Sequence, residues 1–150
     1  MSVFDRLRLD GRSAFITGGS RGLGREIALG LAEAGADITL TARTAESLEQ
    51  TAEDIRAMGR KVRTMVADMA DPATCEMACS RALDDAGCFD ILVNNIGGRR
   101  VNVGLEEMPL DQWHQLLDLN LTSTFLCCKH MGGAMIRRGT GGRIINLASI

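Results

Sequence analysis

The segment Thr17-Gly18-Gly19-Ser20-Arg21-Gly22-Leu23-Gly24 lies between an apolar run, SAFIT (residues 13–17), and an amphipathic stretch that begins at Gly22. Glycine permits a tight turn and lets a ligand approach the backbone closely. The start of a helix presents free N–H groups and a partial positive charge, which suit a pyrophosphate. A glycine loop that follows a strand and opens a helix therefore predicts a nucleotide-phosphate site.

Short apolar runs alternate with helical patterns on either side of this loop. We expect strands at residues 13–17, 37–41, 61–67, 89–94 and 143–148. We expect helices at residues 22–34, from an N-cap at Thr44 to Gly59, from Asp71-Pro72 to Gly87, and over residues 110–138. This alternation predicts an α/β fold with helices on both faces of a parallel sheet. A doubly wound, Rossmann-type sheet forming one domain over residues 1–150 is the leading arrangement.

The longest helical pattern has an apolar stripe that we expect to be buried: Trp113, Leu116, Leu117, Leu121 and Phe125. Methionines at helical positions, such as Met58, Met77 and Met135, suit gap-filling between packed helices.

Composition is that of a soluble globular protein: 150 residues, 45% hydrophobic and 24% charged. The net charge of −2 gives no basic footprint for nucleic acid or an anionic membrane. No apolar run approaches the ~20 residues of a membrane span, and residues 1–11 have no signal-peptide core. We therefore expect a cytoplasmic protein.

The five cysteines are Cys75, Cys79, Cys88, Cys127 and Cys128. Cys75 and Cys79 are four residues apart on one helix face, where they could share a metal, but no histidine lies near them in the sequence. Reduced, buried cysteines acting as small apolar side chains are the expected state. We predict neither a disulfide nor a metal site.

The loop spacing, TGxxxGxG, resembles that of the short-chain dehydrogenase/reductase family. Four later places support the resemblance. Asp68-Met69 follows the third strand, as the family's adenine-contacting Asp does, and Asn94-Asn95-Ile96-Gly97 resembles the family's NNAG. Asn120 and Ser149 lie where the family has its helical Asn and its catalytic Ser. The cofactor-binding residues that the resemblance implies are Gly18, Ser20, Arg21, Gly22, Leu23, Gly24, Arg43, Asp68, Met69, Asn94, Asn95 and Gly97.

The end of the second strand bears on which dinucleotide binds. An NAD site usually has an acidic residue there, which bonds the ribose 2′-OH. Here that place reads Thr41-Ala42-Arg43, while Asp37 is at the wrong end of the strand and Glu46 is already in the helix. Arg43 and Arg21 suit a 2′-phosphate, because arginine binds phosphate bidentately. We expect NADP(H) rather than NAD(H).

The resemblance implies hydride transfer between NADP(H) and a small carbonyl or alcohol substrate. Ser149 would polarise the substrate oxygen and Asn120 would hold a proton-relay water. The family's YxxxK pair follows the catalytic Ser, but these 150 residues contain no Tyr. The chain resembles the N-terminal part of such an enzyme, so its sheet should be incomplete on the C-terminal side, with Ile144, Ile145 and Leu147 at an apolar edge. The 150 residues alone should be inactive.

The resemblance also implies a homo-oligomer, a dimer or a tetramer. The motifs resemble those of 3-oxoacyl-carrier-protein reductases and of sugar-acid or steroid dehydrogenases. The sequence does not rank these classes of enzyme. One alternative is a non-catalytic NADP-binding module. Another is a doubly wound protein whose loop holds a mononucleotide or a flavin, against which Asp68, residues 94–97 and Ser149 argue. Arg99 and Arg100 could touch a substrate, but we expect them to face solvent.

Overall fold

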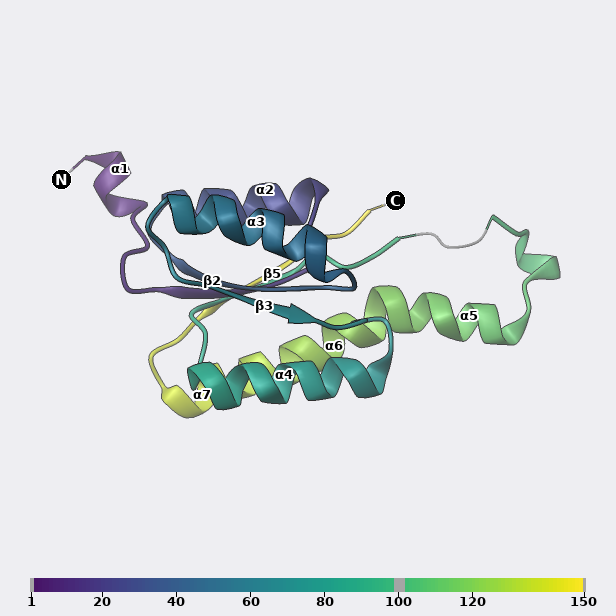
Figure 1. Ribbon diagram of the computed structural model, residues 1–150. Coiled ribbons are helices and arrows are strands. Elements are labelled where there is room, and N and C mark those ends of the chain that lie inside the picture. The colour runs from purple at the N-terminus through teal and green to yellow at the C-terminus, as the bar shows by residue number, and fades with distance from the viewer. Residues whose placement is uncertain (1, 99–101, 150) are drawn as a thin grey trace.

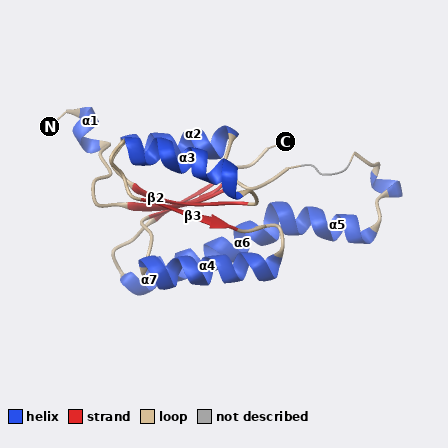
Figure 2. Ribbon diagram, viewed as in Figure 1, coloured by secondary structure: helices blue, strands red, loops and turns tan. Residues whose placement is uncertain are grey.

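The computed structural model describes residues 2–98 and 102–149, which form a five-stranded sheet between two layers of helices (Figure 1, Figure 2). The strands are β1 (Ser13–Thr17), β2 (Asp37–Ala42), β3 (Val62–Val66), β4 (Ile91–Asn94) and β5 (Arg143–Asn146). The α-helices are α1 (Val3–Arg6), α2 (Gly22–Glu33), α3 (Ala45–Ala57), α4 (Pro72–Ala86), α5 (Leu110–Leu117), α6 (Ser123–Cys127) and α7 (Gly133–Arg138). A short 3₁₀ turn, Leu105–Glu107, precedes α5.

Every strand pairing is parallel, and the strand order is β3-β2-β1-β4-β5. The chain starts in the centre at β1, winds outward through β2 to β3, and then crosses back to β4 and β5 on the other side. Ala14 of β1 therefore pairs with Ile38 on one side and with Ile91 on the other. The winding direction reverses between β1 and β4, and open α/β proteins bind ligands at such a switch point. The predicted doubly wound parallel sheet is confirmed.

The two faces of the sheet bury different residues. Ala14 and Ile16 of β1 pack into an upper core beneath α2 and α3, whereas Phe15 faces a lower core above α4 and α6. Phe15 lies 5.4 Å from Phe89, measured between ring centroids. Both faces are covered, which explains why β1 reads as a continuous apolar run and not as an alternating one.

Local signals place most helix ends correctly. The Asp71 carboxylate accepts from the Thr74 N–H over 2.8 Å, and Pro72 opens α4 as predicted. Gly87 ends α4 with a φ of 75°, a conformation that glycine adopts without strain. Thr44 stands at the predicted N-cap position of α3, but its side chain makes no capping hydrogen bond.

The predicted helix over residues 110–138 is one helical run, in which π-helical turns at Asp118–Thr122 and Cys128–Gly132 separate α5, α6 and α7. Its predicted buried stripe was wrong, because Trp113, Leu121 and Phe125 are 44%, 62% and 60% exposed. The side facing the sheet carries Leu119, Ser123, Leu126, Cys127, Met131 and Met135 instead. Two π-turns shift the register of the helix, and α5 projects beyond the sheet (Figure 1), so sequence spacing did not identify the buried side.

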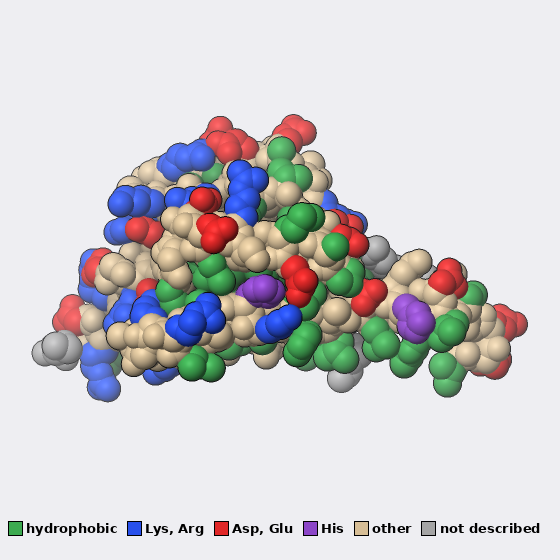
Figure 3. All heavy atoms as spheres, turned by 90° about the horizontal axis from the view of Figure 1, so that it is seen from below, with side chains coloured by type: hydrophobic (Ala, Val, Ile, Leu, Met, Phe, Trp, Pro, Cys, Tyr) green, Lys and Arg blue, Asp and Glu red, His purple; other side chains and the backbone are tan. Residues whose placement is uncertain are grey.

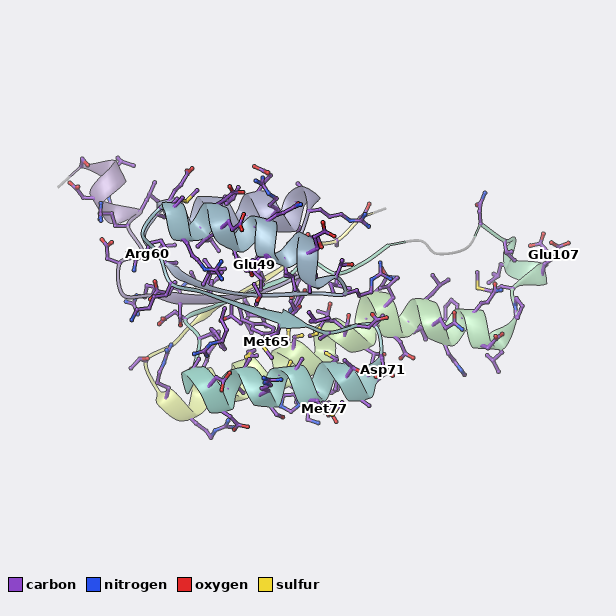
Figure 4. The ribbon with its side chains drawn as sticks, viewed as in Figure 1. Glu49, Arg60, Met65, Asp71, Met77 and Glu107 are labelled. Atoms are coloured by element: carbon purple, nitrogen blue, oxygen red, sulfur yellow. The ribbon has the colours of Figure 1, made fainter. Side chains whose placement is uncertain are left out.

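The methionines singled out in the sequence are also partly buried in the core and partly exposed. Met135 is buried in the lower core, as predicted, but Met58 and Met77 are 38% and 64% exposed. Met77 lies on the outer side of α4, and Met65 of β3 lies between the sheet and that helix (Figure 4). The prediction that these methionines fill gaps between packed helices is therefore confirmed for Met135 and wrong for Met58 and Met77. Within the described residues, no helix combines the length and the apolar character needed to cross a bilayer.

Candidate functional site

A cleft of about 520 Å³ lies at the carboxyl ends of the strands, over the switch point between β1 and β4. Segments that follow four different strands line it. They contribute Gly18, Ser20 and Arg21 after β1, Arg43, Thr44 and Ser47 after β2, Asp68 after β3, and Asn95, Ile96, Gly97 and Gly98 after β4. Ala42 and Leu119 complete the lining. The fold thus brings together seven of the predicted cofactor-binding residues: Gly18, Ser20, Arg21, Arg43, Asp68, Asn95 and Gly97.

The glycine loop is held against the end of β2. The N–H groups of Gly18 and Gly19 both donate to the Thr41 carbonyl oxygen, over 2.9 and 3.1 Å. Gly18 has a φ of 69°, which a bulkier residue would adopt only with strain. A Cβ on Gly24 would overlap the Gly18 carbonyl oxygen, so glycine is needed there for α2 to approach the loop. Gly22 and the exposed Leu23 form the first turn of α2.

The start of α2 fits an anionic group. No side chain caps this end of the helix, and its first turn contains no acidic residue. The unsatisfied N–H groups of a first helical turn attract anions, and phosphate is the usual one. Ser20 and Arg21 precede this turn and line the cleft. The residues present therefore fit the pyrophosphate of a dinucleotide.

Asn95 and Thr17 join β4 to the glycine loop. The Asn95 side-chain amide donates to the carbonyl oxygens of Thr17 and Gly18, each over 3.1 Å. The Thr17 hydroxyl oxygen accepts from the N–H groups of Asn95 and Ile96, over 3.0 and 3.3 Å. Sequence reasoning included Thr17 in the motif but gave it no role in the site. Its position as the last residue of a buried strand, directly before the glycines, was the available signal.

Two cations line the cleft, Arg21 from the loop after β1 and Arg43 directly after β2. Arg21 and Arg43 are exposed, and neither guanidinium forms an ion pair with a carboxylate of the described residues. Asp37, at the far end of β2, pairs with Arg60 over 2.8 Å. Thr44 and Ser47 add hydroxyl groups next to Arg43. Sequence reasoning missed both of these hydroxyls, although Ser47 lies in the first turn of α3, shortly after Arg43.

Other predicted cofactor contacts have different surroundings. The Asp68 carboxylate accepts from the Ala70 N–H over 3.1 Å and lines the cleft. Met69 is fully buried in the lower core, so its side chain does not face the cleft. The Asn94 amide donates to Asn146 Oδ1 over 2.8 Å and lies beneath the sheet end, away from the cleft lining. The side chains of Met69 and Asn94 therefore lie outside the cleft lining.

Asn120 lies in the first π-helical turn and holds the segment that follows β4. Its Oδ1 accepts from the Gly98 N–H over 2.9 Å, and its Nδ2 donates to the carbonyl oxygens of Gly98 and Leu116. π-Turns are frequent at functional sites. Ser149 is exposed and follows β5, outside the cleft lining. Arg99 and Arg100 lie outside the described residues.

An open parallel sheet with a glycine loop, an uncapped helix start and a cleft at its switch point defines a nucleotide-binding α/β protein of the Rossmann type. The family model for short chain dehydrogenases matches residues 12–150. The chain belongs to this family, as the resemblance predicted.

Similarity to known proteins supports this assignment. Gluconate 5-dehydrogenase from Gluconobacter oxydans is 37% identical over all of this chain and 58% of its own length. A short-chain type dehydrogenase/reductase from Mycobacterium marinum is 36% identical, with a TM-score of 0.89 over 99% of this chain and 60% of that one. A metagenomic short-chain oxidoreductase in complex with NADP is 33% identical, with a TM-score of 0.88 over 95% of this chain and 64% of that one. The chain thus spans less than two thirds of the length of each of these relatives.

Proposed function

We propose that this chain is the dinucleotide-binding domain of an NADP(H)-dependent oxidoreductase that acts on a carbonyl or alcohol substrate. The observation that carries the proposal is the cleft over β1 and β4, which Arg21 and Arg43 line, together with the uncapped start of α2 directly after Arg21. When bound, the nicotinamide ring supplies or accepts a hydride. The protein must then orient the cofactor and move a proton.

Each part of the cleft has a role in this proposal. The first turn of α2 and Ser20 hold the pyrophosphate. Asp68 binds on the adenine side, and the segment from Asn95 to Gly98 borders the nicotinamide side. Asn120 keeps that segment in place through its two hydrogen bonds to Gly98. Ser149 polarises the substrate oxygen, and Asn120 also holds a water of the proton relay.

Arg21 and Arg43 set the preference for NADP(H) over NAD(H). A 2′-phosphate offers charged oxygens to two guanidinium groups that no described carboxylate neutralises. Hydrogen bonds to charged groups contribute about 1.5–3 kcal/mol each, which is enough to select one cofactor. The alternative, a non-catalytic NADP-binding module, predicts the same binding but no turnover in any longer form of the protein.

Exposed apolar residues of α5 and α6 support a homo-oligomer, a dimer or a tetramer. Trp113, Leu121 and Phe125 lie on this helical run, and in the view from below hydrophobic side chains are exposed along the lower layer (Figure 3). Patches of this kind mark interaction surfaces. The five free cysteines suit a reducing compartment, and we place the protein in the cytoplasm.

The test is the ratio of NADPH affinity to NADH affinity, measured by nicotinamide fluorescence. Arg43→Ala should lower that ratio by about tenfold or more, the equivalent of losing one charged hydrogen bond. Arg137→Ala, an exposed arginine of α7, is the matched control and should leave the ratio unchanged. An unaltered ratio in Arg43→Ala would contradict the assignment of NADP(H).

A further inference from the structure

Three cysteine side chains meet in the lower core, away from the nucleotide cleft. The Sγ atoms of Cys75 and Cys79, on α4, each lie 3.8 Å from the Sγ of Cys127, at the end of α6. All three sulfur atoms lie within 4.8 Å of one another, and all three residues are fully buried. Cys75 and Cys79 are one helical turn apart, so both face α6. The sequence alone placed only two of the three together.

The surrounding core is rich in sulfur. Of the thirteen buried residues described for the lower core, six carry sulfur: Met69, Cys75, Cys79, Cys127, Met131 and Met135. The buried residues described for the upper core include none. Sulfur atoms accordingly gather between the sheet and the lower helices in Figure 4. One core of the protein thus presents soft, polarisable ligands on a single side of the sheet.

We propose that Cys75, Cys79 and Cys127 form a three-thiolate site for a soft monovalent cation of the copper(I) class. A cation with metal–sulfur bonds of about 2.3 Å sits at the centre of a sulfur triangle with edges of about 4.0 Å. The two edges that meet at Cys127 are 3.8 Å, and the third, between Cys75 and Cys79, is no longer than 4.8 Å. The ligands are therefore close to their binding positions before the cation arrives.

The number of ligands favours copper(I) over zinc. Structural zinc is almost always four-coordinate, and no fourth His, Cys, Asp or Glu of the described residues joins this cluster. Soft thiolate ligands suit copper(I), zinc and iron–sulfur clusters, and of these zinc and the clusters take four protein ligands. Binding needs no oxidant, since the cation arrives as copper(I) and each thiol that becomes a ligand releases its proton to solvent.

The test is an anaerobic titration of the reduced protein with copper(I), in competition with a chromogenic copper(I) chelator. We expect one equivalent to bind and X-ray absorption to show three sulfur neighbours. Cys127→Ser should weaken binding by more than about 100-fold, because loss of a partner outside the ligand set alone costs up to that much. Cys88→Ser is the matched control, since Cys88 is half-buried and outside the cluster, and its affinity should be unchanged.

A second measurement does not depend on the variants folding. Copper(I) should raise the unfolding midpoint of the unmodified protein, because a ligand of the native state stabilises it, and zinc(II) should raise it less. No binding to the unmodified protein, equal binding by a folded Cys127→Ser, or tighter four-coordinate zinc binding would each overturn the proposal.

Discussion

The side-chain amide of Asn95 donates a hydrogen bond to the carbonyl oxygen of Gly18 over 3.1 Å, joining the end of β4 to the glycine loop after β1. The two residues are 77 positions apart in the sequence. The same amide also reaches the Thr17 carbonyl oxygen. The switch point between β1 and β4 is thus fixed by side-chain hydrogen bonds as well as by strand pairing.

Asn95→Ala should loosen this junction. The variant leaves two carbonyl oxygens without their partner, and a broken hydrogen bond of this kind costs about 1–3 kcal/mol. We expect that loss in the free energy of unfolding, measured with urea, together with weaker NADPH binding. Asn102→Ala removes an exposed loop asparagine and should change neither quantity. Equal behaviour of the two variants would contradict a joining role for Asn95.

Alanine substitutions at two glycines of α2 should change the stability of the protein in opposite directions. A Cβ on Gly24 would overlap the Gly18 carbonyl oxygen and the Asn95 amide, so Gly24→Ala should destabilise the protein and displace the loop. Gly30 has open space around it, and Gly30→Ala should stabilise the protein by about 0.5–1 kcal/mol. Thermal unfolding and NADPH titration of both variants check this. Destabilisation by Gly30→Ala, or none by Gly24→Ala, would be inconsistent with the packing described.

Asp90 should make stability depend on pH. Burial acts to raise the pKa of its carboxyl, but the Ser13 N–H and the nearby Arg12 and Arg138 outweigh burial and lower that pKa. Because the folded-state pKa is depressed, the contribution is fully present above the ordinary value near 4 and is lost as pH falls through the folded-state value.

Asp90→Asn should therefore cost about 1–2 kcal/mol of unfolding free energy at pH 7, after allowance for the partly exposed arginines. The difference from the unmodified protein should shrink as pH falls below about 4. Asp85→Asn, at a half-exposed ion pair with Arg63, should cost less than about 0.5 kcal/mol. A deficit for Asp90→Asn that grew in acid would contradict the sign argued above.

A polypeptide of residues 1–150 should bind NADPH without turning over any carbonyl. Proton transfer in the family relies on a Tyr and a Lys after the catalytic Ser, and these residues contain no Tyr. The assay follows NADPH absorbance over a panel of sugar-acid, 3-oxoacyl and steroid ketones, with the intact mass of 16.1 kDa verifying the species tested. Measurable turnover would contradict the prediction that proton transfer requires the family's Tyr and Lys.

Local signals were enough to predict the sheet and much of the cleft. The glycine loop, the Asp71-Pro72 start of α4 and the apolar β1 depend on neighbours in sequence and on burial, and all are confirmed. Trp113 and Phe125 were placed wrongly, because periodicity does not reveal where a π-turn shifts a helix or where the sheet ends. The meeting of Cys127 with Cys75 was also out of reach, since it depends on how α4 packs against α6.

Hydrogen–deuterium exchange with and without NADPH tests the central claim most directly, because a second groove offers a competing site. The second, between β3 and α4, has a volume of about 720 Å³ and also contains two arginines, Arg63 and Arg81. We predict protection of residues 18–24, 42–47 and 95–98, at the carboxyl ends of β1, β2 and β4, with residues 63–67 and 74–85 unchanged. Protection confined to the β3–α4 groove, or no protection at saturating NADPH, would contradict the assignment of the cleft over β1 and β4 as the dinucleotide site.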